Sequence, residues 1–195
     1  MINLTKIKMK QIVIIALLMV AFNSYAKYYP GTLTFENGKS REGFIESNLG
    51  DVILFKGWME AQPEEIQAAS IKTVWIKTNG GHKMHEYHYL PVDGSDKVSH
   101  RMWLKPLEKG AVNLFVHDTI LQQDGLDKTE ALDFYCLREG EKVASLIASR
   151  NDAHIFKSKA PHFFADRPLL VEKIKSKEYT WENVQQLVSH YNHSM

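Results

Sequence analysis

The sequence predicts a mainly β fold of the α+β class, an antiparallel sandwich or partly open barrel with two or three short C-terminal helices. Short apolar/polar alternations recur between residues 31 and 148, and turns containing glycine, asparagine or aspartate separate them. From about Ile155 a helical spacing of apolar residues replaces the alternation. With 195 residues, 44% of them hydrophobic, the chain has material for one core. We therefore expect a β-rich body over residues 27–154 and a helical cap over residues 155–195 of the same domain.

The first 26 residues predict a secretory signal peptide. Three lysines precede an apolar run over residues 12–22, and Ser24 and Ala26 place small residues at the two positions that determine cleavage. The run is shorter than the roughly 20 residues that a membrane-spanning helix needs. We expect cleavage after Ala26, a secreted or periplasmic mature protein, and no transmembrane segment in it.

Charge and cysteine content narrow the class of partner. Residues 27–195 carry a formal net charge of about −2, because the leader contains three lysines and no acids. A chain without a basic excess is poorly suited to neutralise phosphates, so we expect no nucleic-acid partner. The lone cysteine, Cys136, lies in an apolar alternation with Leu132 and Phe134, and we expect it to be buried rather than reactive.

The opening stretch, residues 31–56, predicts a β-meander. Asn37-Gly38 stands between two alternating runs and predicts a hairpin with a type I′ turn. Gly43 in the second strand is a position where another backbone can approach closely. Residues 52–55 are apolar on both faces, which predicts a central strand.

The rest of the body predicts further strands and one helical interruption. Residues 63–69 begin with Pro and two acids, which predicts one or two helical turns. Strands are expected over residues 71–77, 83–90, 101–105, 111–117, 132–137 and 142–148, with a polar connection over residues 122–128. Gly140 can supply the left-handed residue of the last hairpin.

The C-terminal segment predicts helices that lie across an open end or edge of the sheet. Asp166 is expected to cap a helix that begins at Pro168, and Thr180 to cap the last one. Such helices would protect a sheet edge from pairing with other chains.

The run from Phe163 to Asn192 resembles the ending of a group of short secreted proteins from Bacteroidota bacteria. Residues 104–118 and the glycines at 31, 38 and 43 are similar to that group as well. The matching C-terminal positions are Phe164, Asp166, Pro168, Leu169, Ile174, Lys177, Tyr179, Val184, Val188, Tyr191 and Asn192. Arg167 stands where the group often has a cysteine. The resemblance implies secretion and a β-rich body with a helical end, and it implies no reaction.

A cluster of histidines is the sharpest candidate for chemistry. His82, His85 and His88 lie within seven residues, and imidazole is the commonest neutral metal ligand. In a strand, however, His82 and His88 share a face with Glu86 while His85 points away. A solvated polar strand face is the competing interpretation. The pattern also differs from the H-E-x-x-H of zinc proteases.

Other candidate groups are weaker. Asp93 with Asp96, and Asp124 with Asp127, lie in turns where aspartate is common for backbone reasons. The aromatic residues near strands predict either core packing or a stacking platform for a glycan or an apolar peptide. They are Trp58, Trp75, Trp103, Tyr87 and Tyr89.

These patterns favour a non-catalytic binding or structural module of the cell envelope, with no cofactor and with an envelope protein or a saccharide as partner. The chain contains none of the short signatures of hydrolases, phosphate loops or dinucleotide sites. The alternative is a metal-assisted hydrolase that uses the histidine-rich strand. A small barrel resembling SH3-like or Sm-like folds would also fit the opening stretch, as an interaction module.

Overall fold

The computed structural model describes residues 27–93, 100–123 and 126–194. The predicted signal peptide lies outside these residues. Within them, no helix is both long and apolar enough to cross a membrane.

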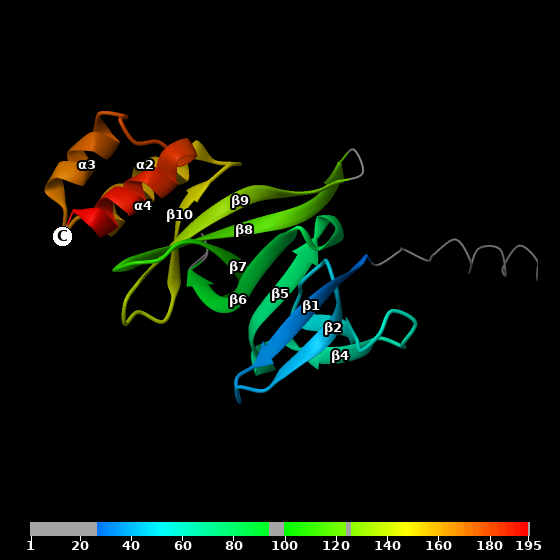
Figure 1. Ribbon diagram of the computed structural model, residues 1–195. Coiled ribbons are helices and arrows are strands. Elements are labelled where there is room, and N and C mark those ends of the chain that lie inside the picture. Colours follow the sequence, from blue (N-terminus) through cyan, green and yellow to red (C-terminus); the bar gives the residue numbers. More distant parts are fainter. Residues whose placement is uncertain (1–26, 94–99, 124–125, 195) are drawn as a thin grey trace, which may run out of the picture.

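The ten strands within the described residues belong to one sheet, which runs in the order β10-β9-β8-β7-β6-β5-β1-β2-β3-β4 (Figure 1). The strands are β1 (Tyr28–Phe35), β2 (Ser40–Glu46), β3 (Val52–Lys56), β4 (Glu64–Gln67), β5 (Ile71–Thr78), β6 (Lys83–Asp93), β7 (His100–Glu108), β8 (Val112–Gln123), β9 (Leu126–Arg138) and β10 (Ala144–Ser149). Neighbours in this order are antiparallel. The sheet order keeps most chain neighbours adjacent, but it inserts β1 between β5 and β2.

The second half of the sheet curls into part of a ring. β10 pairs with β9 and also, in parallel, with β6, through Ala144 opposite Val92 and Ser145 opposite Asp93. Strands β6 to β10 each contribute to one apolar cluster, made of Val92, Leu104, Phe115, Tyr135, Ala144 and Leu146. The expected mainly antiparallel fold is thus confirmed, with partial ring closure that falls short of a barrel.

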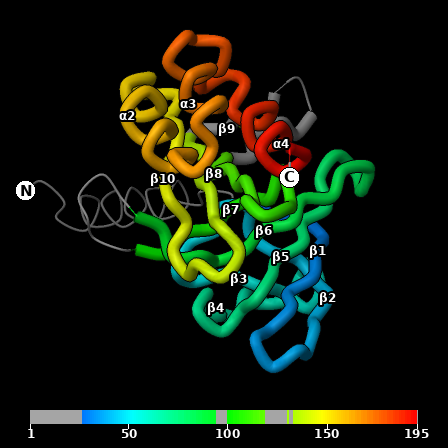
Figure 2. Tube along the Cα trace, turned by 90° about the vertical axis from the view of Figure 1, so that its left-hand side faces the viewer, coloured from blue at the N-terminus to red at the C-terminus, as the bar shows by residue number. Residues whose placement is uncertain are grey.

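The three α-helices of the described part of the chain gather at one end of the molecule, away from β1 to β5 (Figures 1 and 2). They are α2 (Ala153–Phe163), α3 (Pro168–Lys175) and α4 (Val184–His193), with a 3₁₀ turn, η3 (Trp181–Asn183), before α4. The C-terminal segment packs against apolar residues of β8, β9 and β10 through the buried side chains of Phe156, Phe164, Leu170 and Leu187. The expectation of a helical C-terminal segment on the sheet is confirmed.

A second core fills the other end of the sheet. Apolar side chains from β1 to β5 pack with Tyr87, Tyr89 and Trp103 of β6 and β7. Gly31 and Gly43 permit this packing, because a Cβ on either would lie 2.3 Å from a backbone oxygen of the neighbouring strand. The close approach expected at Gly43 is confirmed.

The structure corrects three predictions for the strands. Residues 64–67 form edge strand β4 and not a helix, with only the one-turn η1 (Ala68–Ser70) after it. β3 lies next to this edge and buries one face, so it is not a central strand. Most of the stretch expected as a polar connection, residues 122–128, belongs to the long hairpin of β8 and β9.

The turn at Asn37-Gly38 forms the predicted hairpin with a different geometry. Only Gly38 has a positive φ, of 80°, so the turn is not type I′. Gly38 N–H donates to Phe35 O at 2.9 Å, and Phe35 N–H donates to Lys39 O at 2.9 Å. This is a three-residue loop with glycine in the left-handed position. Gly140, with φ of 86°, fills the same role in the last hairpin as predicted.

The helix starts also differ in part from the prediction. Asp166 does not cap α3, whose N-cap residue is Arg167. Instead, Asp166 accepts hydrogen bonds from Arg138 and Tyr191, at 2.7 and 2.6 Å. Thr180 caps the 3₁₀ turn η3 that leads into α4, and Asn183 Oδ1 accepts the backbone N–H of Thr180 at 2.6 Å, but the N-cap residue of α4 itself is Asn183.

Candidate functional site

A pocket of about 240 Å³ lies between the loop over residues 47–51, which joins β2 to β3, and strands β6, β7 and β8. Tyr87 and Tyr89 line it from β6, and Trp103 lines it from β7. These residues come together because Tyr87 and Tyr89 share one face of β6 and Tyr89 lies directly opposite Trp103 in the next strand. The pocket therefore opens at the margin of the core that β1 to β5 form.

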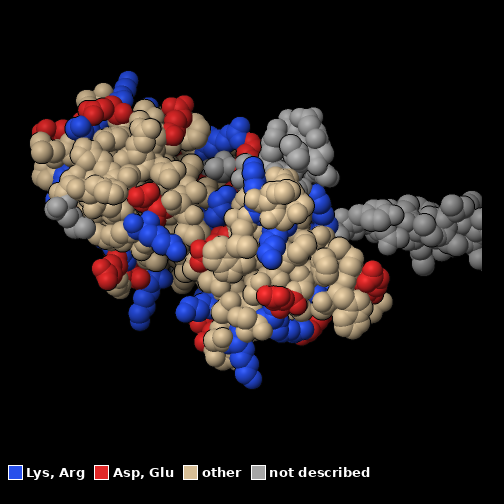
Figure 3. Space-filling view, viewed as in Figure 1, with Lys and Arg blue, Asp and Glu red and all other residues tan. Residues whose placement is uncertain are grey.

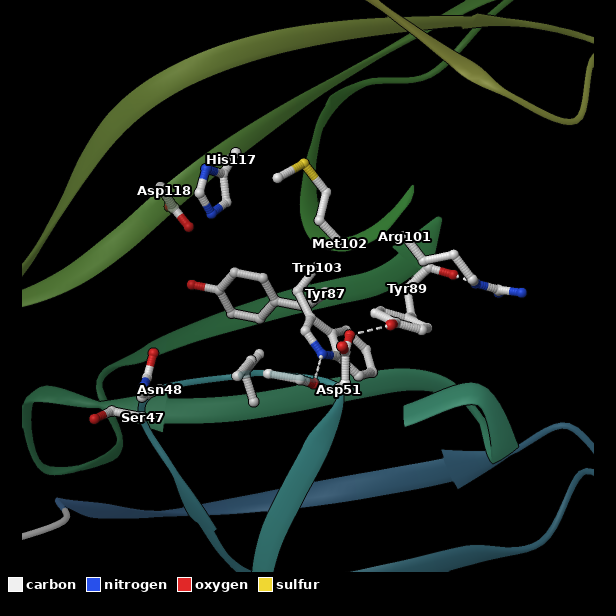
Figure 4. A pocket seen from close by; sticks show the side chains of 12 residues that line it. Ser47, Asn48, Asp51, Tyr87, Tyr89, Arg101, Met102, Trp103, His117 and Asp118 are labelled. Carbon is white, nitrogen blue, oxygen red and sulfur yellow. Dashed lines mark hydrogen bonds between the residues drawn. The ribbon is translucent and has the colours of Figure 1, made fainter. Parts of the chain in front are cut away.

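The aromatic side chains hold the loop against the sheet (Figure 4). The indole N–H of Trp103 donates to Gly50 O at 2.9 Å, and Tyr89 Oη donates to Asp51 Oδ1 at 2.5 Å. The two rings lie 5.1 Å apart between centroids. The loop is thus fixed at two successive residues.

Arg101 forms part of the rim. Its guanidinium donates to Tyr89 O at 2.8 Å and lies 4.9 Å above the centre of the Tyr89 ring. Burial, followed by the hydrogen bond and the charge of Asp51, raises the pKa of Tyr89. Tyr89 therefore stays a neutral donor to Asp51 at physiological pH.

Two consecutive residues of β8 line the pocket beside a bulge in the neighbouring strand β9, where His117 lies opposite Asp133 and Asp118 lies opposite Ala131. Neighbouring residues of a regular strand point to opposite faces, yet His117 and Asp118 both line the pocket. The pairing of β8 with β9 shifts register between these two residues. Bulges are common beside binding and catalytic sites.

Asp118 is the most buried charged group of the pocket. Its side chain is 1% exposed, and its Oδ2 forms an ion pair with Lys105 Nζ at 2.5 Å. Its Oδ1 makes no hydrogen bond with any residue that the structure describes. Taking a carboxylate out of water is costly unless its lone pairs are satisfied, so Asp118 is only half compensated.

Tyr87 presents the second unsatisfied atom. The residue is 3% exposed, and its Oη lies near enough to Asp118 for a side-chain interaction, but it makes no hydrogen bond of ordinary geometry within the described part of the chain. Figure 4 shows the hydroxyl pointing toward the carboxylate of Asp118. Burial is the main cause that raises the pKa of Tyr87, and the negative charge of Asp118 and a side-chain interaction with Asp118 raise it further. Tyr87 therefore remains protonated and offers a donor beside an acceptor.

The charges of the site balance. The negative charges of Asp51 and Asp118 are equal in number to the positive charges of Arg101 and Lys105. Lys105 forms an ion pair with Asp118, and both Asp51 and Arg101 form hydrogen bonds with Tyr89. The face of the molecule in Figure 3 likewise shows acidic and basic side chains interspersed. The pocket can therefore hydrogen-bond a polar group without demanding a charge on it.

The three candidate histidines do not line this pocket, and the structure does not bring them together. His82 is exposed in the turn before β6. His85 Nε2 lies 3.0 Å from Thr78 Oγ1, whereas His88 Nε2 lies 2.8 Å from Glu86 Oε1, on the opposite face of β6. Across the residues described, no group of three or more potential ligands is close enough to hold a metal ion.

The weaker candidate Asp93 and the cysteine Cys136 have structural roles. Asp93 Oδ1 accepts the backbone N–H of Leu146 at 2.6 Å and so joins β6 to β10. Asp96 and Asp124 lie outside the described residues. Cys136 is fully buried as predicted, and burial raises the pKa of its thiol.

Of the aromatic candidates, Trp103, Tyr87 and Tyr89 line the pocket, whereas Trp58 is 66% exposed on the loop between β3 and β4. No local sequence pattern indicated the roles of Asp51, Lys105 or Asp118. One signal was present: two consecutive polar residues, His117 and Asp118, follow the apolar run over residues 114–116 of β8. Comparisons with protein-family models, curated proteins and solved structures found no significant match to this chain.

Proposed function

We propose that the mature chain is a non-catalytic binding module of the cell envelope, whose ligand occupies the pocket beneath the loop over residues 47–51. Export is supported by the leader pattern of residues 1–26, and the resemblance to secreted proteins of Bacteroidota points the same way.

One observation carries the proposal of a ligand. Tyr87 Oη and Asp118 Oδ1 are buried side by side without hydrogen bonds from the described residues. An unsatisfied buried polar group lowers the stability of a fold by about 1–3 kcal/mol, so two such groups side by side destabilise this fold. A bound group that accepts from Tyr87 and donates to Asp118 would recover that stability.

The contacts of the pocket support binding rather than turnover. Ser47 is the serine that lines the pocket. Among the described residues, its side chain has no hydrogen bond to a histidine or a carboxylate. Nucleophilic catalysis by serine needs such a base within hydrogen-bond reach. The remaining lining includes His117, Asn48 and two apolar side chains, and it otherwise consists of aromatic rings and charged groups, which suit recognition.

The test is a two-dimensional ¹⁵N–¹H NMR screen of the mature protein. Pools of neutral, anionic and cationic small polar compounds are added, and the indole N–H signal of Trp103 is followed after its assignment with Trp103→Phe. We expect at least one pool to shift this signal and the backbone signals of residues 47–51, and the bound compound to be recovered unchanged. Shifts confined to other regions, no shift with any pool, or chemical conversion of the compound would each contradict the proposal.

A further inference from the structure

This inference rests on the function proposed above, namely that a ligand binds in this pocket. The chemistry of the residues that line the pocket indicates the class of that ligand. We propose that the pocket takes a single neutral sugar ring, as the terminal residue of a glycan, and that one hydroxyl of the ring bridges Tyr87 and Asp118.

The paired donor and acceptor select a hydroxyl. Tyr87 Oη stays protonated and donates, while Asp118 Oδ1 can only accept. An alcohol is a neutral group that accepts one hydrogen bond and donates another from the same oxygen. It therefore satisfies both buried atoms at once.

Charged groups fit this position less well. A carboxylate or phosphate would face the buried charge of Asp118, and like charges repel strongly where water is excluded. An ammonium would lie beside Lys105 Nζ, which already holds the other oxygen of Asp118 at 2.5 Å. Asp51 and Arg101 at the rim are engaged with Tyr89 and cancel each other.

The aromatic lining suits the apolar side of a sugar. Tyr89 and Trp103 line the pocket with only 8% and 5% of their surface exposed, and their polar atoms are already bonded to Asp51 and Gly50. What they offer a ligand is therefore apolar ring surface. A pyranose has hydroxyls at its edge and C–H groups on its faces, so it matches a polar pair set beside aromatic rings.

The volume limits the ligand to about one ring. The pocket measures about 240 Å³. Sites that enclose drug-sized molecules have about 300–1,000 Å³. The remaining residues of a glycan would consequently lie outside the pocket.

The test is an NMR titration of the mature protein with monosaccharides that differ in charge. The neutral probes are glucose, galactose, mannose and N-acetylglucosamine; glucuronate and galacturonate carry a negative charge, and glucosamine carries a positive one. We expect saturable shifts of the Trp103 indole signal with at least one neutral sugar, and binding of its charged counterparts at least about tenfold weaker.

Variants connect the affinity to the two buried atoms. Tyr87→Phe removes only the donor and is expected to weaken binding of the neutral sugar about tenfold. Tyr135→Phe removes a hydroxyl from another buried tyrosine outside the pocket and should leave the affinity unchanged. Asp118→Asn is expected to weaken binding at least as much as Tyr87→Phe. If Asp118→Asn does not fold because the ion pair with Lys105 is lost, the comparison of Tyr87→Phe with Tyr135→Phe alone tests the inference.

Three results would overturn the inference: equal or tighter binding of a charged sugar, an affinity that Tyr87→Phe leaves unchanged, or no binding of any monosaccharide. In the last case, compounds of another class that still shift the Trp103 signal would preserve the proposed binding function. If nothing shifts that signal, both fail.

Discussion

Tyr87 and Tyr191 show at the level of single residues how a binding group differs from a structural one. Both are buried, at 3% and 4% exposure. The hydroxyl of Tyr191 accepts from Arg138 at 2.6 Å and donates to Asp166 at 2.6 Å. The hydroxyl of Tyr87 has no such partner among the described residues. The same atom therefore stabilises the fold at one position and costs stability at the other.

This contrast predicts opposite effects of the same substitution. Tyr87→Phe removes an unsatisfied buried hydroxyl and is expected to raise the free energy of unfolding by about 1 kcal/mol. Tyr191→Phe breaks two satisfied hydrogen bonds and is expected to lower it by about 2 kcal/mol. Urea unfolding of the two variants and the parent measures both changes. A loss of stability in Tyr87→Phe similar to that in Tyr191→Phe would show that Tyr87 Oη has a partner in the folded chain.

Asp166 predicts a small pH dependence of stability. Burial alone would raise the pKa of Asp166, but hydrogen bonds from Tyr191 and Arg138 outweigh it and hold the pKa below its usual value. A lowered pKa contributes stability above the ordinary aspartate pKa of about 4, and the contribution disappears as pH falls through the folded pKa. The side chain is 46% exposed, so solvent screening limits the contribution to at most about 1 kcal/mol.

The measurement compares the parent with Asp166→Asn by urea unfolding at pH 7 and near pH 3. We expect the parent to be more stable at pH 7 and the difference to shrink at the lower pH. A difference that is the same at both values would contradict the lowered pKa of Asp166.

At the level of elements, local signals predicted the hairpins well and failed where tertiary pairing decided. Residues 63–67 have the proline and acids of a helix start, yet Ile66 pairs with Ile53 of β3 and is buried. Glu64 forms a bidentate pair with Arg41, at 3.0 and 2.7 Å. These contacts come from residues more than ten positions away, so helix-start patterns within residues 63–69 could not reveal them.

Several of the C-terminal positions singled out in the sequence hold the C-terminal helices to the sheet. Asp166 and Tyr191 bond Arg138, which closes β9. Asn192 accepts the N–H of Val112 at 3.0 Å and donates to its carbonyl at 2.9 Å, as a further strand would. Gly110 leaves room for this side chain, because a Cβ there would lie 2.4 Å from Asn192 Cγ. Packing therefore accounts for these motif positions.

Asn192 is expected to fix α4 on β8. Asn192→Ala leaves both backbone groups of Val112 without this partner and should cost about 2 kcal/mol of unfolding free energy. Gly110→Ala should have a similar effect through the steric clash. Gln185→Ala on the same helix is the control, because that exposed amide reaches Leu107 O only at 3.5 Å. Faster amide hydrogen exchange in α4 for Asn192→Ala, but not for Gln185→Ala, is the expected result; equal exchange in both would contradict the role of Asn192.

At the level of the whole molecule, the fold class could be predicted and the strand order could not. Alternation and turn residues are local, and they identified most strands and the change to helices. The insertion of β1 beside β5 and the return of β10 to β6 depend on contacts over long sequence separations. The residues that line the pocket are spread from Ser47 to Asp118 in the sequence. Its aromatic residues could be named as candidates from the sequence, but their proximity to Asp51 and Asp118 could not be predicted.

The predicted export applies to the whole chain. Expressed with its leader in a bacterium that has a general secretory pathway, the protein should appear outside the cytoplasm with an intact mass that begins at Lys27. Small residues at the cleavage site are the reason. Replacing Ala26 with a bulky residue should block processing and serves as the control. Full-length protein retained in the cytoplasm in the unmodified case would contradict the prediction.

The most direct test of the binding account is a crystal structure of the mature protein soaked with the neutral sugar that binds most tightly. We predict one sugar ring in the pocket, with a hydroxyl oxygen within about 3 Å of both Tyr87 Oη and Asp118 Oδ1 and a ring face against Trp103 or Tyr89. A sugar bound elsewhere, or a direct hydrogen bond between Tyr87 and Asp118 that closes the site, would contradict it.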